Sequence, residues 1–222
     1  MKRPAPTTAT AVAVALCGLL TACAGPKAVQ QTLLSSDLKA AYLSPDQTLA
    51  QARHAIVFED GQRATSCNTY LPLIARVALD EGVNNQAIKS GYLECEALDL
   101  IAKAQPFAGN VDTASMGRLL LDRLDLRSFP NSLAMQATDQ AFTLATLFPQ
   151  NLKANGVSAT LETADTRLNL HVVAVVQANG NASPDWIVQV ANEFKTGNYR
   201  GYATLLLIDP LEKATVQGRS YP

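Results

Sequence analysis

RLNLHVVAVVQ, residues 167–177, is the stretch of sequence that decides the fold. Apolar residues recur along it at every second position, which is the period of a β-strand. The apolar face of this strand comprises Leu168, Leu170, Val172, Ala174 and Val176. We therefore expect a β-sheet that contains residues 167–177.

Further strands are expected because the period-two pattern continues through the second half of the chain. They fall at residues 157–163, 186–191, 199–208 and 214–217. Thr196-Gly197-Asn198 and Asp209-Pro210 are residue types that form tight turns between neighbouring strands. Short turns join antiparallel neighbours, so an antiparallel β-meander is predicted.

The first half of the chain has helical patterns instead. Helices are expected over residues 33–41, 45–58, 71–79, 84–102 and 113–120. The clearest start is Ser44, with Pro45 at the first helical position and Gln47 completing a capping box. The predicted fold is α+β: a helical region, residues 31–126, packed with the β-meander, residues 127–222, as one fused domain.

The first residues have the order of features of a targeting segment. Lys2 and Arg3 give a positive start, and residues 9–20 form a mostly apolar run that is too short to span a bilayer. The run ends in the tetrapeptide LTAC, residues 20–23, which resembles the lipobox of bacterial lipoproteins. An ordinary secretory signal with an incidental cysteine near the cleavage site is the alternative.

The resemblance implies that residues 1–22 are a signal peptide and that cleavage leaves a covalent lipid on Cys23. Residues 23–30 then comprise the lipidated cysteine and a short tether, and the acyl chains anchor the protein to a membrane. In lipoprotein sorting of the enterobacterial kind, Asp after the cysteine retains the protein in the inner membrane. Ala24 stands there, so we expect the outer membrane of a Gram-negative cell, facing the periplasm.

The net charge of the chain after removal of the signal peptide indicates which partners to expect. Loss of Lys2 and Arg3 with the signal peptide reduces the 18 basic residues to 16 against 19 acidic ones, a net charge of −3. No basic run or patch is visible in the sequence, so nucleic acid is not expected as a partner. The expected partners are the membrane, through the lipid, and an envelope protein.

The positions of the cysteines in the sequence indicate a different role for each. Of the four, Cys17 leaves with the signal peptide and Cys23 takes the lipid, which leaves Cys67 and Cys95 in a compartment that permits disulfides. A bond between them closes a loop of roughly 30 residues and is worth about 3.5 kcal/mol on the chain-entropy model. Two buried free thiols are the alternative.

Residues 175–188, VVQANGNASPDWIV, resemble the D-x-N-G-D-G-x-P-D hairpin loop of FG-GAP/VCBS-type repeats. Those repeats build β-propeller blades, and their loop often binds Ca²⁺. The residues that match are Asn179, Gly180, Pro184 and Asp185. A plain Asn-Gly hairpin turn is the alternative.

The same loop departs from the calcium-binding pattern. Gln177 and Asn181 stand where the pattern has Asp, and Ala182 stands where it has Gly. The metal ligands implied are Asn179, Asn181 and Asp185, of which only Asp185 is charged. Calcium affinity depends on the number of carboxylates, so we expect no cofactor besides the lipid on Cys23.

No catalytic site is predicted. His54 falls in the second expected helix, and His171 lies mid-strand on the face opposite Leu170 and Val172. Neither histidine has a partner at metal-ligand spacing, and no nucleophile elbow or phosphate loop occurs. Carboxylates recur at spacings typical of a solvated helix face or loop, at Glu94, Glu96, Asp99, Asp122 and Asp125. We therefore do not expect an enzyme.

Candidate interaction residues are the only Trp and two tyrosines. Trp186 shares a strand face with Val188, which favours core packing. Tyr199 and Tyr202 flank Arg200, a combination typical of recognition surfaces. Cross-strand tyrosine pairs that stabilise the sheet explain the tyrosines equally well.

Three classes of function remain open at this point. The first is an envelope lipoprotein with a binding or structural role. The second is a periplasmic inhibitor or immunity protein against a cell-wall hydrolase, which would present a rigid exposed loop. The third is an enzyme, which would require a pocket around His171.

Overall fold

The computed structural model describes residues 32–222; the predicted signal peptide, the lipid on Cys23 and the tether lie outside the described residues. The helices are α2 (Ser36–Leu43), α3 (Pro45–Ala50), α4 (Cys67–Ile74), α5 (Val83–Lys89), α6 (Leu93–Lys103), α7 (Met116–Arg123) and α8 (Leu144–Leu147), with the 3₁₀ turns η1 (Ser90–Tyr92), η2 (Leu126–Ser128) and η3 (Ala134–Gln136). The strands are β1 (Ile56–Val57), β2 (Arg63–Ala64), β3 (Gln105–Pro106), β4 (Leu124–Asp125), β5 (Leu152–Asn155), β6 (Ser158–Glu162), β7 (Thr166–Gln177), β8 (Asp185–Phe194), β9 (Arg200–Leu207) and β10 (Val216–Ser220). Within residues 32–222, no helix has both the length and the apolar character needed to cross a membrane.

The main sheet has the strand order β4-β10-β9-β8-β7-β6-β5, with β3 paired to β7 outside this path. Neighbouring strands from β5 to β10 are antiparallel, whereas β10 and β4 are parallel. The fold is therefore mixed α+β with an antiparallel-rich sheet. β1 and β2 form a separate antiparallel hairpin inside residues 31–126, where the sequence predicted helices alone.

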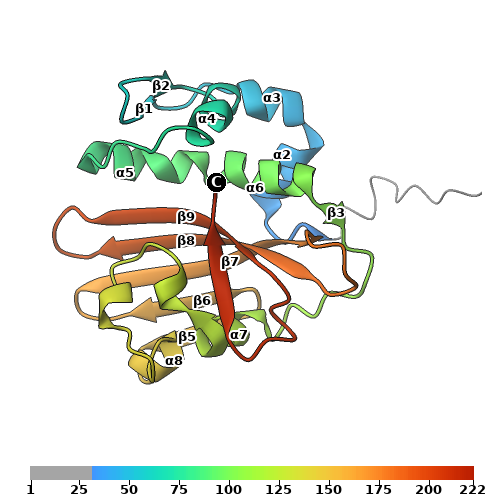
Figure 1. The fold of residues 1–222 in the computed structure, drawn as a ribbon, viewed down its shortest axis with the longest axis vertical. Coiled ribbons are helices and arrows are strands. Elements are labelled where there is room, and N and C mark those ends of the chain that lie inside the picture. Colours follow the sequence, from blue (N-terminus) through green and yellow to red (C-terminus); the bar gives the residue numbers. More distant parts are fainter. Residues whose placement is uncertain (1–31) are drawn as a thin grey trace, which may run out of the picture.

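The elements stack in layers on the two faces of the sheet (Figure 1). One buried cluster joins α7 and α8 to one face, through residues such as Leu120 and Leu144. A second cluster joins α2 and α6 to the other face, through Leu38 and Leu98. A third cluster, which includes Tyr70, lies in the outer layer, where α3, α4 and the β1–β2 hairpin sit over α5 and α6.

In the middle of strand β7, the alternation of side chains between the two faces of the sheet is shifted by one residue. Its register with β8 slips between Val172 and Ala174. Before the slip, Leu168 and Val172 belong to the cluster under α7, whereas Ala174 and Val176 belong to the cluster under α6. The prediction of one continuous apolar face is therefore wrong for the last two residues. A bulge adds one residue to a strand, so every side chain beyond it moves to the opposite face.

The predicted helix 45–58 ends early, at Ala50. Ile56 lies in β1, and Phe58 forms a β-bridge with Leu79. Asp60-Gly61 is the turn of the β1–β2 hairpin, with a φ of 83° at Gly61. Ile56 and Phe58 are two residues apart, which suits a strand, and the Asp-Gly turn lets that strand pair with β2.

Two helix starts differ from prediction. Ser44 precedes α3, but its side chain makes no capping hydrogen bond, so the capping box with Gln47 is absent. The next helix, α4, begins at Cys67 rather than at residue 71 because Ser66 and Thr69 form a reciprocal capping box there.

The predicted helix 84–102 consists of two helices. α5 and α6 are separated by the 3₁₀ turn η1. Gly82 is the N-cap residue of α5. The break lets α5 and α6 cover different parts of the sheet (Figure 1).

The predicted disulfide between Cys67 and Cys95 is confirmed, with a Cα–Cα distance of 5.3 Å. Cys67 is the first residue of α4, and Cys95 lies in α6. Both side chains are fully buried in the outer-layer cluster. The bond therefore fastens the outer layer to the helix that covers the sheet.

We expect reduction of this disulfide to lower the free energy of unfolding by about 3.5 kcal/mol, because the bond closes a loop with a sequence separation of 28. A loss of that size corresponds to a fall in Tm of roughly 7–14 °C for a domain of this size. Thermal unfolding should be followed on protein reduced in denaturant and refolded. The variant with Cys67→Ala and Cys95→Ala is the control, and its Tm should not respond to reductant; an equal response in both proteins would contradict the prediction.

Candidate functional site

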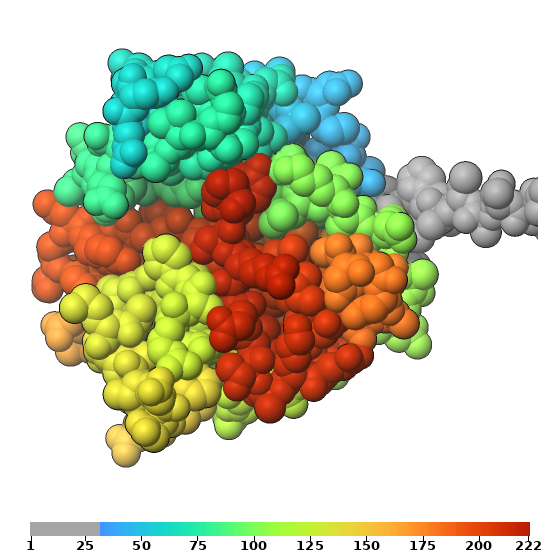
Figure 2. Space-filling model, in the orientation of Figure 1, coloured from blue at the N-terminus to red at the C-terminus, as the bar shows by residue number. Residues whose placement is uncertain are grey.

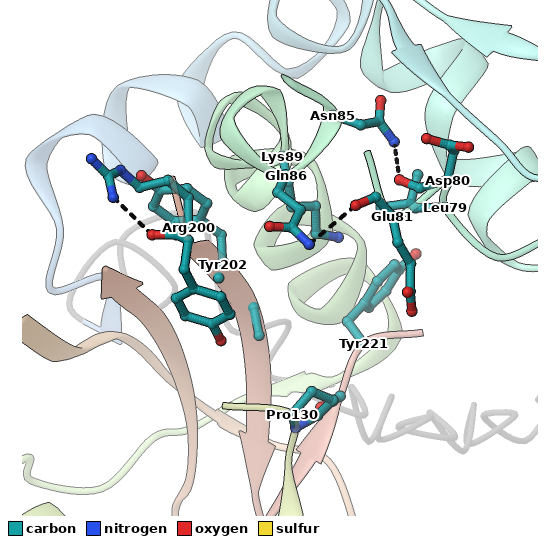
Figure 3. Close-up of a pocket in the computed structure, with 14 residues that line it drawn as sticks. Leu79, Asp80, Glu81, Asn85, Gln86, Lys89, Pro130, Arg200, Tyr202 and Tyr221 are labelled. Carbon is teal, nitrogen blue, oxygen red and sulfur yellow. Dashed lines mark hydrogen bonds between the residues drawn. The ribbon is translucent and has the colours of Figure 1, made fainter. Parts of the chain in front are cut away.

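A groove of about 420 Å³ opens between α5 and the start of β9. One wall is the segment from Leu79 to Lys89, and the other is residues 199–203 of the sheet (Figure 3). Pro130 and Tyr221 border the space between these walls. In Figure 2 the orange-red β9 segment is recessed between green α5, the yellow-green segment that follows Pro130 and the dark-red end of the chain. We call this hollow the α5 groove.

The helical wall is held in place by Asn85, a buried residue of α5. Its Oδ1 accepts a hydrogen bond from the Val57 N–H at 2.7 Å. Its Nδ2 donates to the carbonyl oxygens of Val57, at 2.8 Å, and Asp80, at 2.7 Å. One amide thus ties the start of α5 to the β1–β2 hairpin, and so fixes the position of Asp80.

The sheet wall is also internally bonded. The Tyr202 hydroxyl donates to Glu193, and burial followed by this carboxylate raises the pKa of Tyr202 to about 12. The Arg200 guanidinium donates to the carbonyls of Phe194, at 2.8 Å, and Tyr199, at 2.7 Å. The rings of Tyr199 and Phe194 have centroids 4.9 Å apart. The two tyrosines singled out from the sequence therefore lie together in this wall, half-buried and fixed by neighbours.

The third border of the groove is Tyr221. Its N–H donates to the Thr204 carbonyl at 2.9 Å, which fastens it to β9. Its hydroxyl donates to Asp99 of α6 at 2.7 Å. Burial, and then the Asp99 carboxylate, raise the pKa of the Tyr221 hydroxyl. The ring is therefore held between the sheet and α6.

A buried ion pair lies behind the helical wall. Lys89, 11% exposed, donates to Glu96, whose side chain is fully buried. The Tyr70 hydroxyl donates to the same Glu96 oxygen at 2.6 Å and accepts from Lys89 at 2.5 Å. Burial, and then Glu96, raise the pKa of Tyr70. The other oxygen of Glu96 has no partner in residues 32–222. Because charges removed from water need partners, this cluster holds the end of α5 against α4 and α6.

The charges that remain open to a ligand are acidic. Asp80 and Glu81 are exposed on the helical wall, and neither has an ion-pair partner within 4 Å in the described part of the chain. The cations of the groove are compensated, because Lys89 pairs with Glu96, and Arg200 lies 3.9 Å from Glu193. The α5 groove therefore has the chemistry to receive a cationic group.

A second hollow, of about 540 Å³, lies over the polar part of the same sheet face and includes His171 and Gln189. His171 Nδ1 is 2.6 Å from the Ser158 hydroxyl, which is its one side-chain partner in the described residues. Burial lowers the pKa of His171, which favours the neutral form of the ring. Nucleophilic catalysis by such a pair also needs a group that orients the base, and the contacts of His171 supply none.

The loop between β7 and β8 is bonded to itself and to Asp209. Asn179 and Asn181 donate to Asp209 Oδ1, at 3.1 Å and 2.7 Å. Asp185 is fully buried and accepts from the backbone N–H groups of Ala178, at 2.7 Å, and Asp209, at 2.9 Å. The structure thus brings the two asparagines to Asp209 rather than to Asp185. Residues 32–222 contain no group of three or more His, Cys, Asp or Glu side chains placed to hold a metal ion.

Two other residues singled out from the sequence, Trp186 and His54, lie away from the α5 groove. Trp186 is 1% exposed and packs in the cluster under α7, so it has the core position that its strand face favoured and is not available as an interaction residue. His54 lies in the irregular segment between α3 and β1, not in a helix, and it borders a different hollow from His171. The two histidines therefore do not form one site.

Sequence reasoning found one wall of the α5 groove and missed the other. Tyr199 and Tyr202 were identified from residue type. Asp80 and Glu81 were not, because more than one hundred positions separate the two walls and no local pattern joins them. Tyr221, the third border, was not identified either. The available signal was the pair of adjacent acids immediately before Gly82, the N-cap residue of α5.

Comparisons of this chain with protein-family models, with curated proteins and with solved structures found no match.

We expect Lys89→Met to lower the free energy of unfolding by about 3–5 kcal/mol, because it leaves the Glu96 carboxylate buried without its cation. The double variant Lys89→Met, Glu96→Leu should be less destabilised than this single variant, since it removes both charges. Urea unfolding measures the differences. Lys103→Met is the control: it removes a 68%-exposed partner of Asp99 and should cost at most about 1 kcal/mol. Equal losses for the two lysine variants would refute the assigned role of Lys89.

Proposed function

We propose that this chain is a lipid-anchored envelope lipoprotein that binds a protein partner through the α5 groove. The lipobox-like tetrapeptide at residues 20–23 supports the anchor. The observation that carries the binding role is the pair Asp80 and Glu81, which have no ion-pair partner among the described residues, in a groove whose cations Lys89 and Arg200 are paired within the chain. A cationic partner gains contacts there without breaking existing ones.

Preorganisation of its walls favours binding at this groove. Binding affinity is reduced by the entropy of ordering side chains and loops at the interface. Asn85 and Tyr202 are already held by hydrogen bonds, so little ordering remains. A lipid anchor adds to this, because attachment to the same membrane raises the effective concentration of a membrane-bound partner.

An inhibitor or immunity protein against a cell-wall hydrolase is the second candidate. The observation that favours it is the β7–β8 loop, which is exposed at Asn179 and Asn181 yet braced by Asp209. A braced loop is suited to enter the cleft of an enzyme without a large loss of entropy. On this account the contact would be made by the loop rather than by the α5 groove.

The anchor is tested by Cys23→Ala. We expect this variant to move from the membrane fraction to the soluble fraction of the host envelope, because it removes the thiol that takes the lipid. Cys17→Ala is the matched control and should stay with the membrane, since Cys17 lies inside the signal peptide. Fractionation with immunodetection measures both. Membrane retention of the Cys23→Ala protein would overturn the lipoprotein proposal.

The binding surface is tested by photo-crosslinking in living host cells. A photoreactive residue replaces Glu81 in the α5 groove, Asn181 in the β7–β8 loop, or Lys153 on β5 at the opposite edge of the sheet. We expect a discrete protein adduct from position 81 and none from position 153. An adduct from position 181 alone would select the inhibitor, and the absence of adducts at positions 81 and 181 would reject both binding roles.

A further inference from the structure

Strand β9 is paired along its whole length with β8 but only at one end with β10. β10 pairs with Leu205–Leu207, and Tyr221 then bonds to the Thr204 carbonyl. Successive residues of an antiparallel strand direct their backbone groups to opposite neighbours. Thr204 faces β10, so Tyr202 and Arg200 direct their N–H and C=O groups to the same side.

On that side of β9, the backbone groups of Arg200 and Tyr202 are not paired with a neighbouring strand of the described chain. In the described part of the chain, no hydrogen bond reaches the backbone N–H or C=O of Tyr202 or Arg200. Both residues line the α5 groove. An open row of donors and acceptors is a template for another strand, and proteins usually cover or shorten such edges.

The same fold closes a comparable edge elsewhere. The pairing of β6 with β7 ends at His171, with one further hydrogen bond from the Val172 N–H to the Val157 carbonyl at 2.9 Å. Beyond that point the Leu34 N–H donates to the Val173 carbonyl at 2.8 Å, and β3 pairs with Val176 and Gln177. Two separate segments therefore pair with the remainder of β7, whereas no segment within residues 32–222 pairs with the open side of β9 at Arg200 and Tyr202.

β5, an outer strand of the sheet, lacks the features of a docking site. β5 has only four residues, and it presents an exposed Lys153. A short edge strand with a lysine discourages pairing with another chain. The open edge of β9, in contrast, lies in a hollow with a wall on each side (Figure 3).

The charges around this edge select a kind of partner. Asp80 and Glu81 lie on the wall that faces the open residues of β9. Lys89 and Arg200 are compensated by carboxylates of this chain. A Lys or Arg side chain of a bound segment would pair with Asp80 or Glu81, and an acidic segment would be repelled.

We propose that the α5 groove accepts an extended, cationic segment of a partner protein, which adds as a strand to β9 at Arg200 and Tyr202. Backbone hydrogen bonds to these two residues supply the affinity, and a Lys or Arg placed against Asp80 and Glu81 supplies the selectivity. This inference rests on the proposed function, because it specifies how the partner binds at the same groove.

The test uses the full processed protein, extracted in mild detergent, and random twelve-residue peptides displayed on phage. The tightest-binding peptide is synthesised and becomes the probe. We expect the selected peptides to be enriched in Lys and Arg and to alternate between polar and apolar residues. Replacement of Asp80 by Asn together with Glu81 by Gln should weaken the binding of the probe by about two- to fivefold for each lost pair, and Lys153→Gln should leave it unchanged.

Backbone pairing is read by amide hydrogen exchange. On addition of the probe, the N–H groups of Arg200 and Tyr202 should exchange at least tenfold more slowly. The N–H groups of Gly201 and Ala203, which face β8, serve as internal controls and should change little. N-methylation of the probe at alternate residues gives a matched pair, in which only the peptide methylated on the edge facing β9 should lose binding.

Three outcomes would overturn the inference. If no peptide is enriched, or if the two N-methylated peptides bind equally, strand addition is rejected, although crosslinking from position 81 can still establish the groove as a binding surface. If sedimentation shows a dimer that the probe dissociates, a second copy of this chain is the occupant. Failure of the proposed function is distinct, since it is the absence of an adduct from position 81.

Discussion

The bulge at Val173 determines how the layers of this fold assemble. A regular strand has one face for each set of alternate residues, so β7 without a bulge would direct Ala174 and Val176 to the same face as Leu168 and Val172, towards α7. The bulge moves Ala174 and Val176 to the opposite face, where α2 and α6 cover them. It also frees the Val173 carbonyl, which accepts hydrogen bonds from Leu34 and Ser35 at 2.8 Å and 3.2 Å. The first described helix is thereby fastened to the centre of the sheet.

The α5 groove follows from where apolar residues end on that second face. Ile187 and Leu206 pair across β8 and β9 and lie under α6. The next pair on the same face, Gln189 and Thr204, is polar, and Tyr202 comes after it. A helix packs closely over apolar side chains but gains little from covering polar ones. The helical layer breaks at η1, and hollows remain on either side of it.

The sequence was sufficient for the parts of the fold that depend on local periodicity. The strands β6, β7 and β9 were predicted close to their observed bounds, because period two persists in them, whereas β8 ends three residues later than predicted and the prediction for β10 overlaps it only at residues 216–217. The disulfide was predicted by elimination. The bulge could not be found, because residues 172–176 are apolar throughout and any register places apolar side chains on both faces. The hairpin at residues 56–64 was predicted as helix and a turn, because a short apolar run fits either period.

The candidate site was only half predictable for a different reason. Tyr199 and Tyr202 could be singled out because tyrosines beside an arginine are typical of recognition surfaces. The acidic wall depends on Asn85, which makes two hydrogen bonds to Val57 of β1, 28 residues away, and a third to Asp80. Such a contact is set by tertiary packing, which a single sequence does not reveal.

An open strand edge is a hazard for any protein that carries it, because two copies can pair edge to edge. The position of Asp80 and Glu81 reduces that hazard for this chain. Pairing of two β9 edges would bring the acidic walls of both copies towards one gap, and like charges in a partly desolvated gap are unfavourable. A cationic segment meets no such penalty. The same two carboxylates therefore account both for an edge that can stay open and for the class of partner that can close it.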